Sequence, residues 1–234
     1  MPAPEIKHLT FADIAVLSLI FFGTSAYSSL TGYWQLRQAG LVEPVGLAIN
    51  DMATYRVIVM EAVLLVIAWL YLRWRRFDFG VLNFRIDRYT LPLTALLVLG
   101  AGLAADLYQY LHAFLVPEHY PETEAFYPGT RYTLELVSAS LFNGFFEEIF
   151  FMGLVFAVKP KILPQAVAFS LFARFIFHTY QGLAGALTVT TLGVSFWLFR
   201  RKINVLVPFF LAHGIFDMFG LSALGLLFLG SVDN

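Results

Sequence analysis

The sequence predicts an all-α fold, a polytopic bundle of about seven transmembrane helices. Of the 234 residues, 59% are hydrophobic and only 13% are charged, whereas soluble domains carry about 25% charged residues. The mean hydropathy is +0.73. Because one span needs about 20 apolar residues, a chain of this length has room for about seven spans and short loops. We therefore expect a single integral membrane domain over residues 1–234.

Hydropathy sets the order of the expected spans. They are residues 11–30, 53–72, 90–115, 132–156, 165–179, 183–199 and 205 to about 218, with a short apolar tail to residue 230. The stretches between them are rich in Pro, Gly and charge, which is typical of connections. The first apolar run is too long for a signal sequence and too polar at Ser25, Ser28 and Ser29, so we expect a retained first helix.

The basic residues fall on one side of these spans. Eleven lie in the N-terminal tail and in alternate loops: Lys7, Arg73, Arg75, Arg76, Arg85, Arg88, Lys159, Lys161, Arg200, Arg201 and Lys202. The opposite loops hold only Arg37 and Arg131. The positive-inside rule then predicts a cytoplasmic N-terminus and, for seven spans, an outside C-terminus. The expected location is a prokaryotic cell (inner) membrane, which the chain crosses several times.

Charge and cysteine content exclude several functions. A net charge of −1 gives no reason to expect a nucleic-acid partner. The absence of cysteine excludes thiol nucleophiles, disulfides and cysteinyl zinc sites. The expected partners are the lipid bilayer and a membrane-associated protein or peptide.

Ionisable residues inside the expected spans are the candidates for function. They are Arg56, Glu61, Asp106, Glu135, Glu147, Glu148, Arg174, His178, His213 and Asp217. Such groups are costly in hydrocarbon, so they face the bundle interior, pair with each other or do chemistry. We expect Arg56 to pair with Glu61 or Asp106 in the outer half of the membrane. We expect His112 and His119, near the outer end of the third span, to be interfacial and not catalytic.

Depth and helical spacing bring four of these residues together. The helix rise places Glu147, His178, His213 and Asp217 at a similar level, about 14 to 20 Å from the cytoplasmic end of their spans. Residues four apart share one helix face, and three such pairs occur: Asn143 with Glu147, Arg174 with His178, and His213 with Asp217. Glu148 points about 100° away from Glu147. We therefore expect one carboxylate to act and the other to orient or pair.

Three strings carry a resemblance to a known family. NGFFEEIFFMG, FARFIFHTYQG and RRKINVLVPFFLAHGIFDMF resemble the motifs of the CPBP family, membrane proteins that include the type II CAAX prenyl endopeptidases and bacteriocin-processing proteins. The resemblance covers about residues 141–219, within a motif-bearing core of about 132–219. The N-terminal half is similar only as hydrophobic spans with a basic loop.

The resemblance assigns site residues one by one. Glu147 and Glu148 correspond to the family's Glu pair, His178 to the histidine of the second motif, and His213 with Asp217 to the third motif. Two positions depart from the pattern, because Met152 stands where the family has Arg, and Arg174 stands where it has Phe. Our hypothesis is that Arg174 supplies the missing positive charge to Glu148 or to the substrate.

The resemblance also implies an activity, that of an intramembrane glutamate-dependent endopeptidase. A desolvated carboxylate beside an imidazole is a competent general base for water. Glu147 with His178 would activate the water and His213 would stabilise the oxyanion. Asp217 would hold the tautomer of His213 or, if protonated, donate directly to the oxyanion. The substrate would be membrane-associated, with a prenylated CAAX-like peptide as one candidate, entering from the cytoplasmic side or from the lipid. No metal and no cofactor are expected.

Three alternatives stay open at this point. Glu147, His178 and His213 contain the two-His, one-carboxylate set of a catalytic zinc site. The departures at Met152 and Arg174 fit a non-catalytic scaffold of the same fold. A proton-coupled transporter also uses carboxylates and histidines at mid-membrane, although the sequence shows no inverted repeat.

Overall fold

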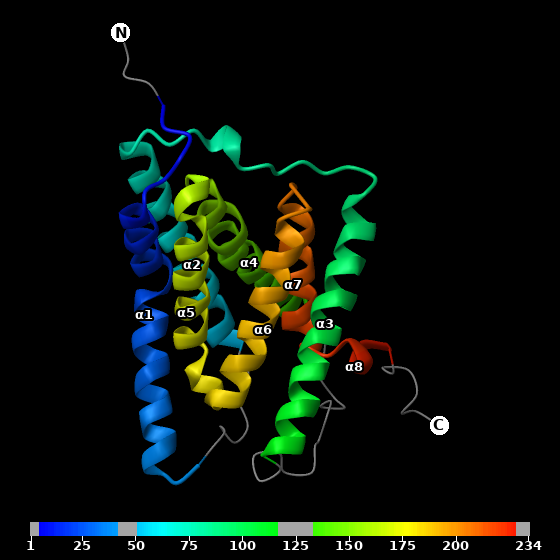
Figure 1. Cartoon of the computed structure of the whole chain (residues 1–234). Helices are drawn as coiled ribbons and strands as arrows, with labels where there is room; N and C mark the ends of the chain where they lie inside the picture. Colours follow the sequence, from blue (N-terminus) through cyan, green and yellow to red (C-terminus); the bar gives the residue numbers. More distant parts are fainter. Residues whose placement is uncertain (1–4, 42–50, 117–132, 228–234) are drawn as a thin grey trace.

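The chain forms a helical bundle, and the expected fold class is confirmed (Figure 1). The computed structural model describes residues 5–41, 51–116 and 133–227. The expectations for His119, for Arg131 and for the end of the apolar tail lie outside these residues. Eight α-helices lie within the described ranges: α1 Phe11–Gln38, α2 Asp51–Trp74, α3 Thr90–Leu115, α4 Leu134–Glu148, α5 Leu163–Phe177, α6 Gly182–Arg200, α7 Val207–Phe219 and α8 Ala223–Leu227.

Five helical segments are long and apolar enough to cross a membrane. They are Phe11–Gln38, Tyr55–Trp74, Thr90–Leu115, Leu134–Ala157 and Thr179–Arg200. The other two expected spans, residues 165–179 and 205–218, correspond to α5 with 15 residues and α7 with 13. At 1.5 Å per residue these helices are about 20 to 22 Å long, against about 30 Å of hydrocarbon. Both helices are therefore too short to cross the hydrocarbon.

A glycine ends α7, whereas α5 ends at His178, four residues before a glycine. The α7 helix stops at Gly220, whose φ of 86° lies in the left-handed region. After α5, the turn Thr179–Gln181 leads to Gly182 with a φ of 80°. Left-handed glycine is a common helix terminator because it lacks a Cβ atom. The ends expected from hydropathy, residues 179 and about 218, lie within two residues of the observed ends.

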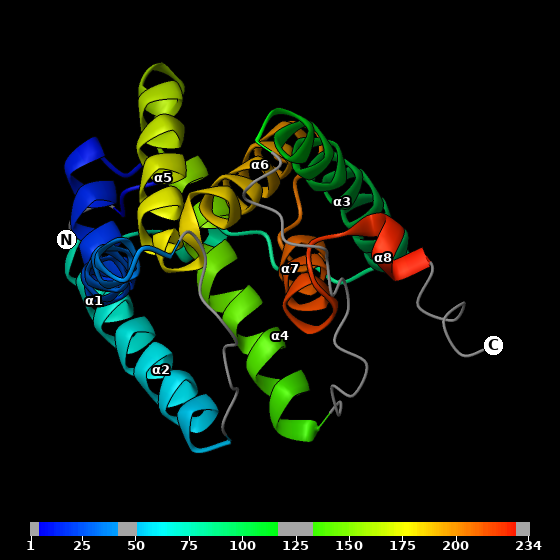
Figure 2. The same cartoon turned by 90° about the horizontal axis from the view of Figure 1, so that it is seen from below.

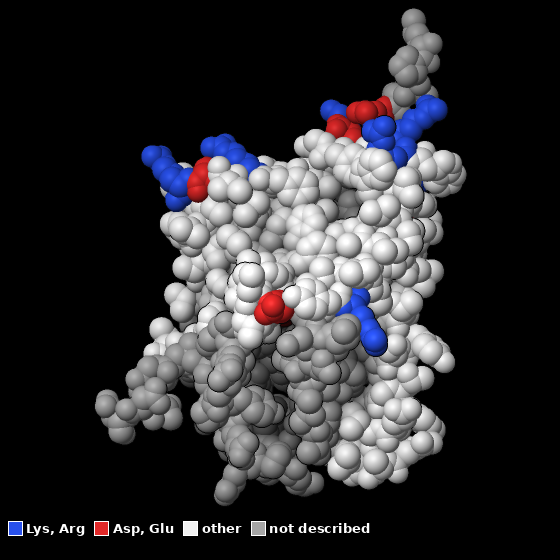
Figure 3. Space-filling view, turned by 180° about the vertical axis from the view of Figure 1, so that it is seen from behind, with Lys and Arg blue, Asp and Glu red and all other residues white. Residues whose placement is uncertain are grey.

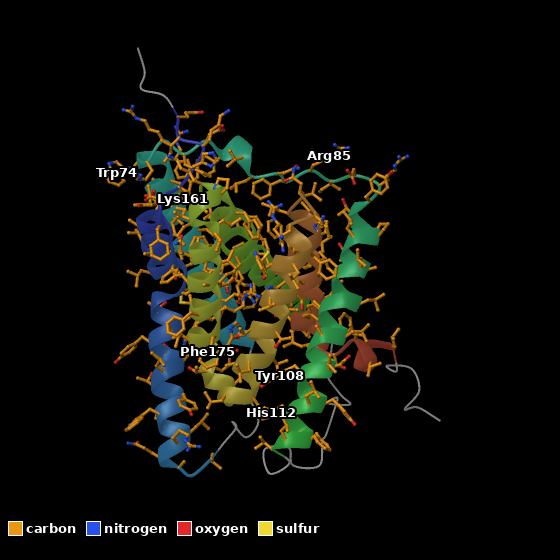
Figure 4. The ribbon with its side chains drawn as sticks, viewed as in Figure 1. Trp74, Arg85, Tyr108, His112, Lys161 and Phe175 are labelled. Atoms are coloured by element: carbon orange, nitrogen blue, oxygen red, sulfur yellow. The ribbon has the colours of Figure 1, made fainter. Side chains whose placement is uncertain are left out.

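Most of the charged surface lies at one end of the bundle. Figure 3 shows Lys and Arg gathered there, and Figure 4 places Arg85, Lys161 and Trp74 at that same end. We call it the basic end. One ion pair there ties α1 to the end of α2, because Arg75 Nε lies 2.6 Å from Asp13 Oδ1. This pairing raises the pKa of Arg75 above its ordinary value.

The α4 and α7 helices approach each other closely because both carry glycine at the contact. A Cβ atom on Gly144 would lie 2.5 Å from the carbonyl oxygen of Phe210 and 2.8 Å from the amide nitrogen of Gly214. A Cβ atom on Gly214 would lie 3.1 Å from the carbonyl oxygen of Ser140. Figure 2 shows α4 lying between α2 and α7. This contact brings His213 of α7 to the Glu pair of α4.

Aromatic rings fasten α1 to the same helices. Phe22 of α1 stacks on Phe177 with ring centroids 4.6 Å apart, and on Phe151 at 4.9 Å. Phe21 packs against Phe146 and Phe150 at 5.0 and 5.5 Å. All of these rings are buried. The long first helix thereby forms one wall beside the Glu pair.

Candidate active site

Glu148 is the point where three helices meet. Its side chain lies on α4 and is 0% exposed. Its Oε1 atom accepts a hydrogen bond from Arg174 of α5 and lies 2.7 Å from Nδ1 of His213 on α7. A buried carboxylate is stable only when it is paired and hydrogen-bonded. Glu148 therefore links α4, α5 and α7 through its partners.

Arg174 is enclosed on all sides. The side chain is fully buried, and its guanidinium carbon lies 4.0 Å from the ring centroid of Phe151. A Cβ atom on Gly193 of α6 would lie 3.0 Å from Arg174 Cδ, so glycine at this position gives the side chain its room. Arg174 also lies 3.9 Å from Oε2 of Glu147. One cation thus serves both carboxylates.

Met152 contributes no charge to this cluster. It is 4% exposed and lies in a wide π-type turn, Ile149–Leu154, that continues α4 directly after the Glu pair. Its carbonyl oxygen accepts a hydrogen bond of 2.8 Å from Arg200 Nε. The positive charge beside Glu148 comes from Arg174, which is the contact that the charge-compensation hypothesis requires. A role of Arg174 in catalysis stays a prediction.

Glu147 has fewer close partners than Glu148. It is 5% exposed, and its Oε1 atom lies 3.4 Å from Nδ2 of Asn143. Its Oε2 atom has no hydrogen-bond partner among the described residues and lies 3.9 Å from Nε2 of His213. Oε2 of Glu148 likewise has no hydrogen-bond partner among the described residues. The two carboxylates therefore differ at Oε1, which has two close partners in Glu148 and one contact at 3.4 Å in Glu147.

His213 is held by Glu148 more closely than by Asp217. Its Nδ1 atom lies 2.7 Å from Glu148, whereas its Nε2 atom lies 3.5 Å from Oδ1 of Asp217. A carboxylate can only accept, so Nδ1 carries a proton. Asp217 in turn accepts a hydrogen bond of 2.7 Å from Asn143. Asp217, which was expected to set the tautomer of His213, thus lies near Nε2. Glu148 contacts Nδ1 and sets the tautomer instead.

His178 has a tautomer fixed by the backbone. It follows the last residue of α5, and its Nδ1 atom lies 2.9 Å from the carbonyl oxygen of Arg174. Because a carbonyl only accepts, Nδ1 donates and Nε2 of the neutral ring keeps its lone pair. The ring packs against Phe177 at 4.1 Å and stacks with Tyr180 at 6.2 Å between centroids. No hydrogen bond joins His178 to Glu147 among the described residues.

These side chains surround one cavity of about 800 Å³. Four of the predicted site residues line it, namely Glu147, His178, His213 and Asp217. Hydroxyl groups of α1 at Thr24, Ser25 and Ser28 line it as well, together with Asn143, Tyr180 and Gln181. Glu148 and Arg174 are absent from the lining. The structure therefore separates the six predicted residues into four that face the cavity and two behind it.

Glu61 lies near the site and not in the expected ion pair. Among the described residues, Arg56 forms no ion pair with Glu61 or Asp106, and Asp106 accepts a hydrogen bond of 3.0 Å from Leu224 N. Glu61 is 4% exposed, and its Oε2 atom has no hydrogen-bond partner in the described part of the chain. The charged groups that act on it are Glu147, Asp217 and His213. It lies about 20 Å from the basic end of α2, so the depth argument used for Glu147 could have found it.

One group of side chains has the spacing of metal ligands. Ligand atoms of Glu147, Glu148 and His213 all lie within 4.8 Å of one another. His178, a member of the zinc set considered from the sequence, is not in this group. The contact between Arg174 and Glu148 already places a positive charge there. A second cation at that carboxylate would be repelled by the guanidinium.

Fold and site together define an integral membrane protein with buried ionisable residues around an interior cavity. The comparison with protein families then gives a more particular class. Residues 129–219 match the family described as Type II CAAX prenyl endopeptidase Rce1-like, and the match supports membership of the CPBP family. It covers less than half of the chain but includes every predicted site residue. Because that family is a protease family, the match supports peptidase activity at family level and a membrane-associated peptide as substrate.

Neither the curated proteins nor the solved structures gave a match to this chain.

Proposed function

We propose that the chain is an intramembrane glutamate-dependent endopeptidase in which Glu147 and His178 activate a water molecule. The observation that supports this most directly is the contrast within the Glu pair. Glu148 is engaged by Arg174 and His213 and lies behind the cavity lining, whereas Glu147 lines the cavity and has no ion-pair partner closer than 3.9 Å. A general base needs a free oxygen within reach of its proton.

The proposed reaction moves one proton twice. The carboxylate of Glu147 takes a proton from water while Nε2 of His178 accepts a hydrogen bond from the same water and orients it. The hydroxide attacks the scissile carbonyl carbon, whose C=O electrons move onto the oxygen. When the tetrahedral intermediate collapses, the C–N bond breaks and Glu147 returns the proton to the leaving nitrogen. No covalent bond to the protein forms.

The oxyanion would be stabilised from α7. Nε2 of His213 faces Glu147 and Asp217, and it donates a hydrogen bond when the ring carries both protons. The amide nitrogen of Asn143 lies at the same wall, where it contacts Asp217 at 2.7 Å and Glu147 at 3.4 Å. One such donor contributes about 10²- to 10³-fold to the rate. In this scheme Glu148 and Arg174 touch no substrate, and they act by holding His213 and α5 in place.

The cavity lining suits a peptide backbone. The hydroxyl groups of Thr24, Ser25 and Ser28 and the amide of Gln181 offer donors and acceptors along its walls. Membrane-associated peptides are therefore the proposed substrate class, and a prenylated CAAX-like peptide is one member of it.

A zinc-dependent peptidase is the second candidate, because Glu147, Glu148 and His213 have metal-ligand spacing. The repulsion from Arg174 makes it the weaker of the two.

The test is cleavage of a membrane-anchored peptide library by the purified protein in detergent. Wild type is compared with Glu147→Gln, His178→Ala and the control Glu135→Gln, which lies on α4 outside the cavity lining. Activity that both site variants lose, that the control keeps and that a strong chelator does not change is the expected result. Activity that survives in Glu147→Gln would refute the proposed base. Absence of cleavage by wild type would favour a scaffold.

A further inference from the structure

A third carboxyl group lies beside the Glu pair, on a helix outside the residues that match the family. Glu61 lies on α2 and is 4% exposed. It shares one helix face with Val57, four residues earlier, and it follows Met60, and both of these residues line the cavity. The helix rise places Glu61 about 20 Å from the basic end of α2 and Glu147 about 15 Å from that end on α4. Glu61 therefore lies at the cavity wall, near the level of the Glu pair.

The cationic groups of the site are already shared among other carboxylates. Arg174 contacts Glu148 and lies 3.9 Å from Glu147. The ring nitrogens of His213 lie 2.7 Å from Glu148, 3.5 Å from Asp217 and 3.9 Å from Glu147. Two side chains that can carry a positive charge thus serve three carboxylates.

Glu61 has no share in these contacts. Among the described residues, no ion pair joins it to Lys, Arg or His, and its Oε2 atom has no hydrogen-bond partner. Two of the three charged groups that act on it, Glu147 and Asp217, are themselves carboxylates. A buried carboxylate without a cation is costly in hydrocarbon, and nearby carboxylates add to that cost. A carboxylic acid that keeps its proton avoids both costs.

We infer that Glu61 is a further positioning residue of the site, a neutral carboxylic acid that leaves the negative charge to Glu147. Carboxyl groups that share a site tend not to ionise together, and the group with cationic neighbours ionises first. Glu147 has two such neighbours at 3.9 Å. On α1, which also packs against α2, the charged residues Asp13 and Arg37 lie near the two ends of the helix, far from the level of Glu61.

This division of charge matters for the proposed reaction, because a base accepts a proton only in its ionised form. The role of Glu147 as that base rests on the proposed function. The protonation of Glu61 does not, because it follows from burial and from the absence of a cation among the described residues.

Infrared spectroscopy tests the protonation directly, because a protonated carboxyl group and a carboxylate absorb at different frequencies. The difference spectrum between wild type and Glu61→Gln, recorded in lipid vesicles at neutral pH, should contain the carbonyl band of one protonated carboxyl group. Glu61→Asp should keep such a band at a shifted frequency, and it carries the same test if Glu61→Gln does not fold. The control Glu135→Gln, in the first turn of α4, should show the loss of carboxylate bands only.

A titration of the same band tests the link to Glu147. Raising the pH should remove the band as Glu61 ionises. Glu147→Gln removes a negative neighbour, so the band should disappear at a pH lower by about one unit than in wild type. Glu135→Gln should leave the titration of the band where it is. A residue that only fills space at position 61 would show no such dependence on Glu147.

Two results would overturn the inference. Loss of carboxylate bands in Glu61→Gln, without a protonated band, would show that Glu61 is ionised. A band whose titration is the same in wild type and Glu147→Gln would show that Glu61 does not bear on the charge of Glu147. Neither readout needs catalysis, so absence of peptide cleavage by wild type would refute the proposed function and leave the charge state of Glu61 as measured.

Discussion

Arg174 contacts Glu148 from α5, so the positive charge beside the Glu pair comes from a different helix than in the family motif that the sequence resembles. That motif has Arg at the position of Met152 and Phe at the position of Arg174. Both residues are buried. A paired exchange tests whether an arginine at either position can serve the same carboxylate.

We expect one substitution to lower stability and cleavage, and the second to restore them in part. Arg174→Phe leaves Glu148 buried without its cation, and removal of one partner of a buried ion pair costs about 3 to 5 kcal/mol. We expect a lower Tm and loss of peptide cleavage. Adding Met152→Arg, in the π-type turn that follows Glu148, should restore both in part. The measurements are thermal unfolding and the cleavage rate of the single and double variants.

Met152→Arg alone is the matched control, since it adds a second cation beside Arg174 and should not improve activity. A double variant no better than Arg174→Phe would contradict the idea that the two positions substitute for each other.

The two carboxylates should respond differently to the same substitution. Glu147→Gln removes the proposed base but no ion pair shorter than 3.9 Å, so we expect cleavage to fall by about 10²-fold or more while Tm stays near that of the wild type. Glu148→Gln removes the partner of Arg174 and His213, so cleavage and Tm should both fall. Measurement of kcat and Tm for both variants separates these roles. Equal losses of Tm would contradict the division of roles within the pair.

Close approach of α4 and α7 should be sensitive to one methyl group. Gly144→Ala places a Cβ atom 2.5 Å from the carbonyl oxygen of Phe210, and such overpacking costs about 1 to 3 kcal/mol. The separated helices would move His213 away from Glu148, so activity should fall as well. Gly23→Ala is the control, because nothing lies within 4 Å of a Cβ atom at that position of α1. A Gly144→Ala variant with normal Tm and activity would show that this contact is not rigid.

Removal of divalent metal ions should leave the activity unchanged. The reason is the guanidinium beside Glu148, which opposes a second cation at that carboxylate. The measurement is cleavage before and after dialysis against a chelator, together with the zinc content of the purified protein. Stoichiometric zinc and activity that returns only with added metal would establish the zinc-dependent candidate.

Composition and helical spacing predicted much of the fold and the site. Low charge and high hydropathy were sufficient for the helical bundle, because a membrane requires every backbone group to be paired within helices. The shared depth of Glu147, His178 and His213 agrees with one cavity that all three line. The ends of α5 and α7 lie within two residues of those expected from hydropathy, at residues 179 and about 218, but both helices were expected to be full spans and are shorter than the other five.

Side-chain partners were harder to predict than positions. The sequence suggested Asp217 as the residue that sets the tautomer of His213, because the two are four residues apart on one helix. The structure gives that place to Glu148. The rotation of α4 against α7 decides this choice, and it depends on the packing at Gly144 and Gly214. Glu61 was expected to be one of two possible partners of Arg56 in the outer half of the membrane, because its neighbours across the bundle are remote in sequence.

The short lengths of α5 and α7 have a consequence for the supply of water. Hydrolysis consumes one water molecule per turnover, and a site enclosed by full-length helices would have to draw it through hydrocarbon. Where α5 gives way to His178 and α7 to Gly220, the cavity reaches the exposed surface. The short lengths of α5 and α7 thus leave a route by which water for the proposed hydrolysis can reach the cavity.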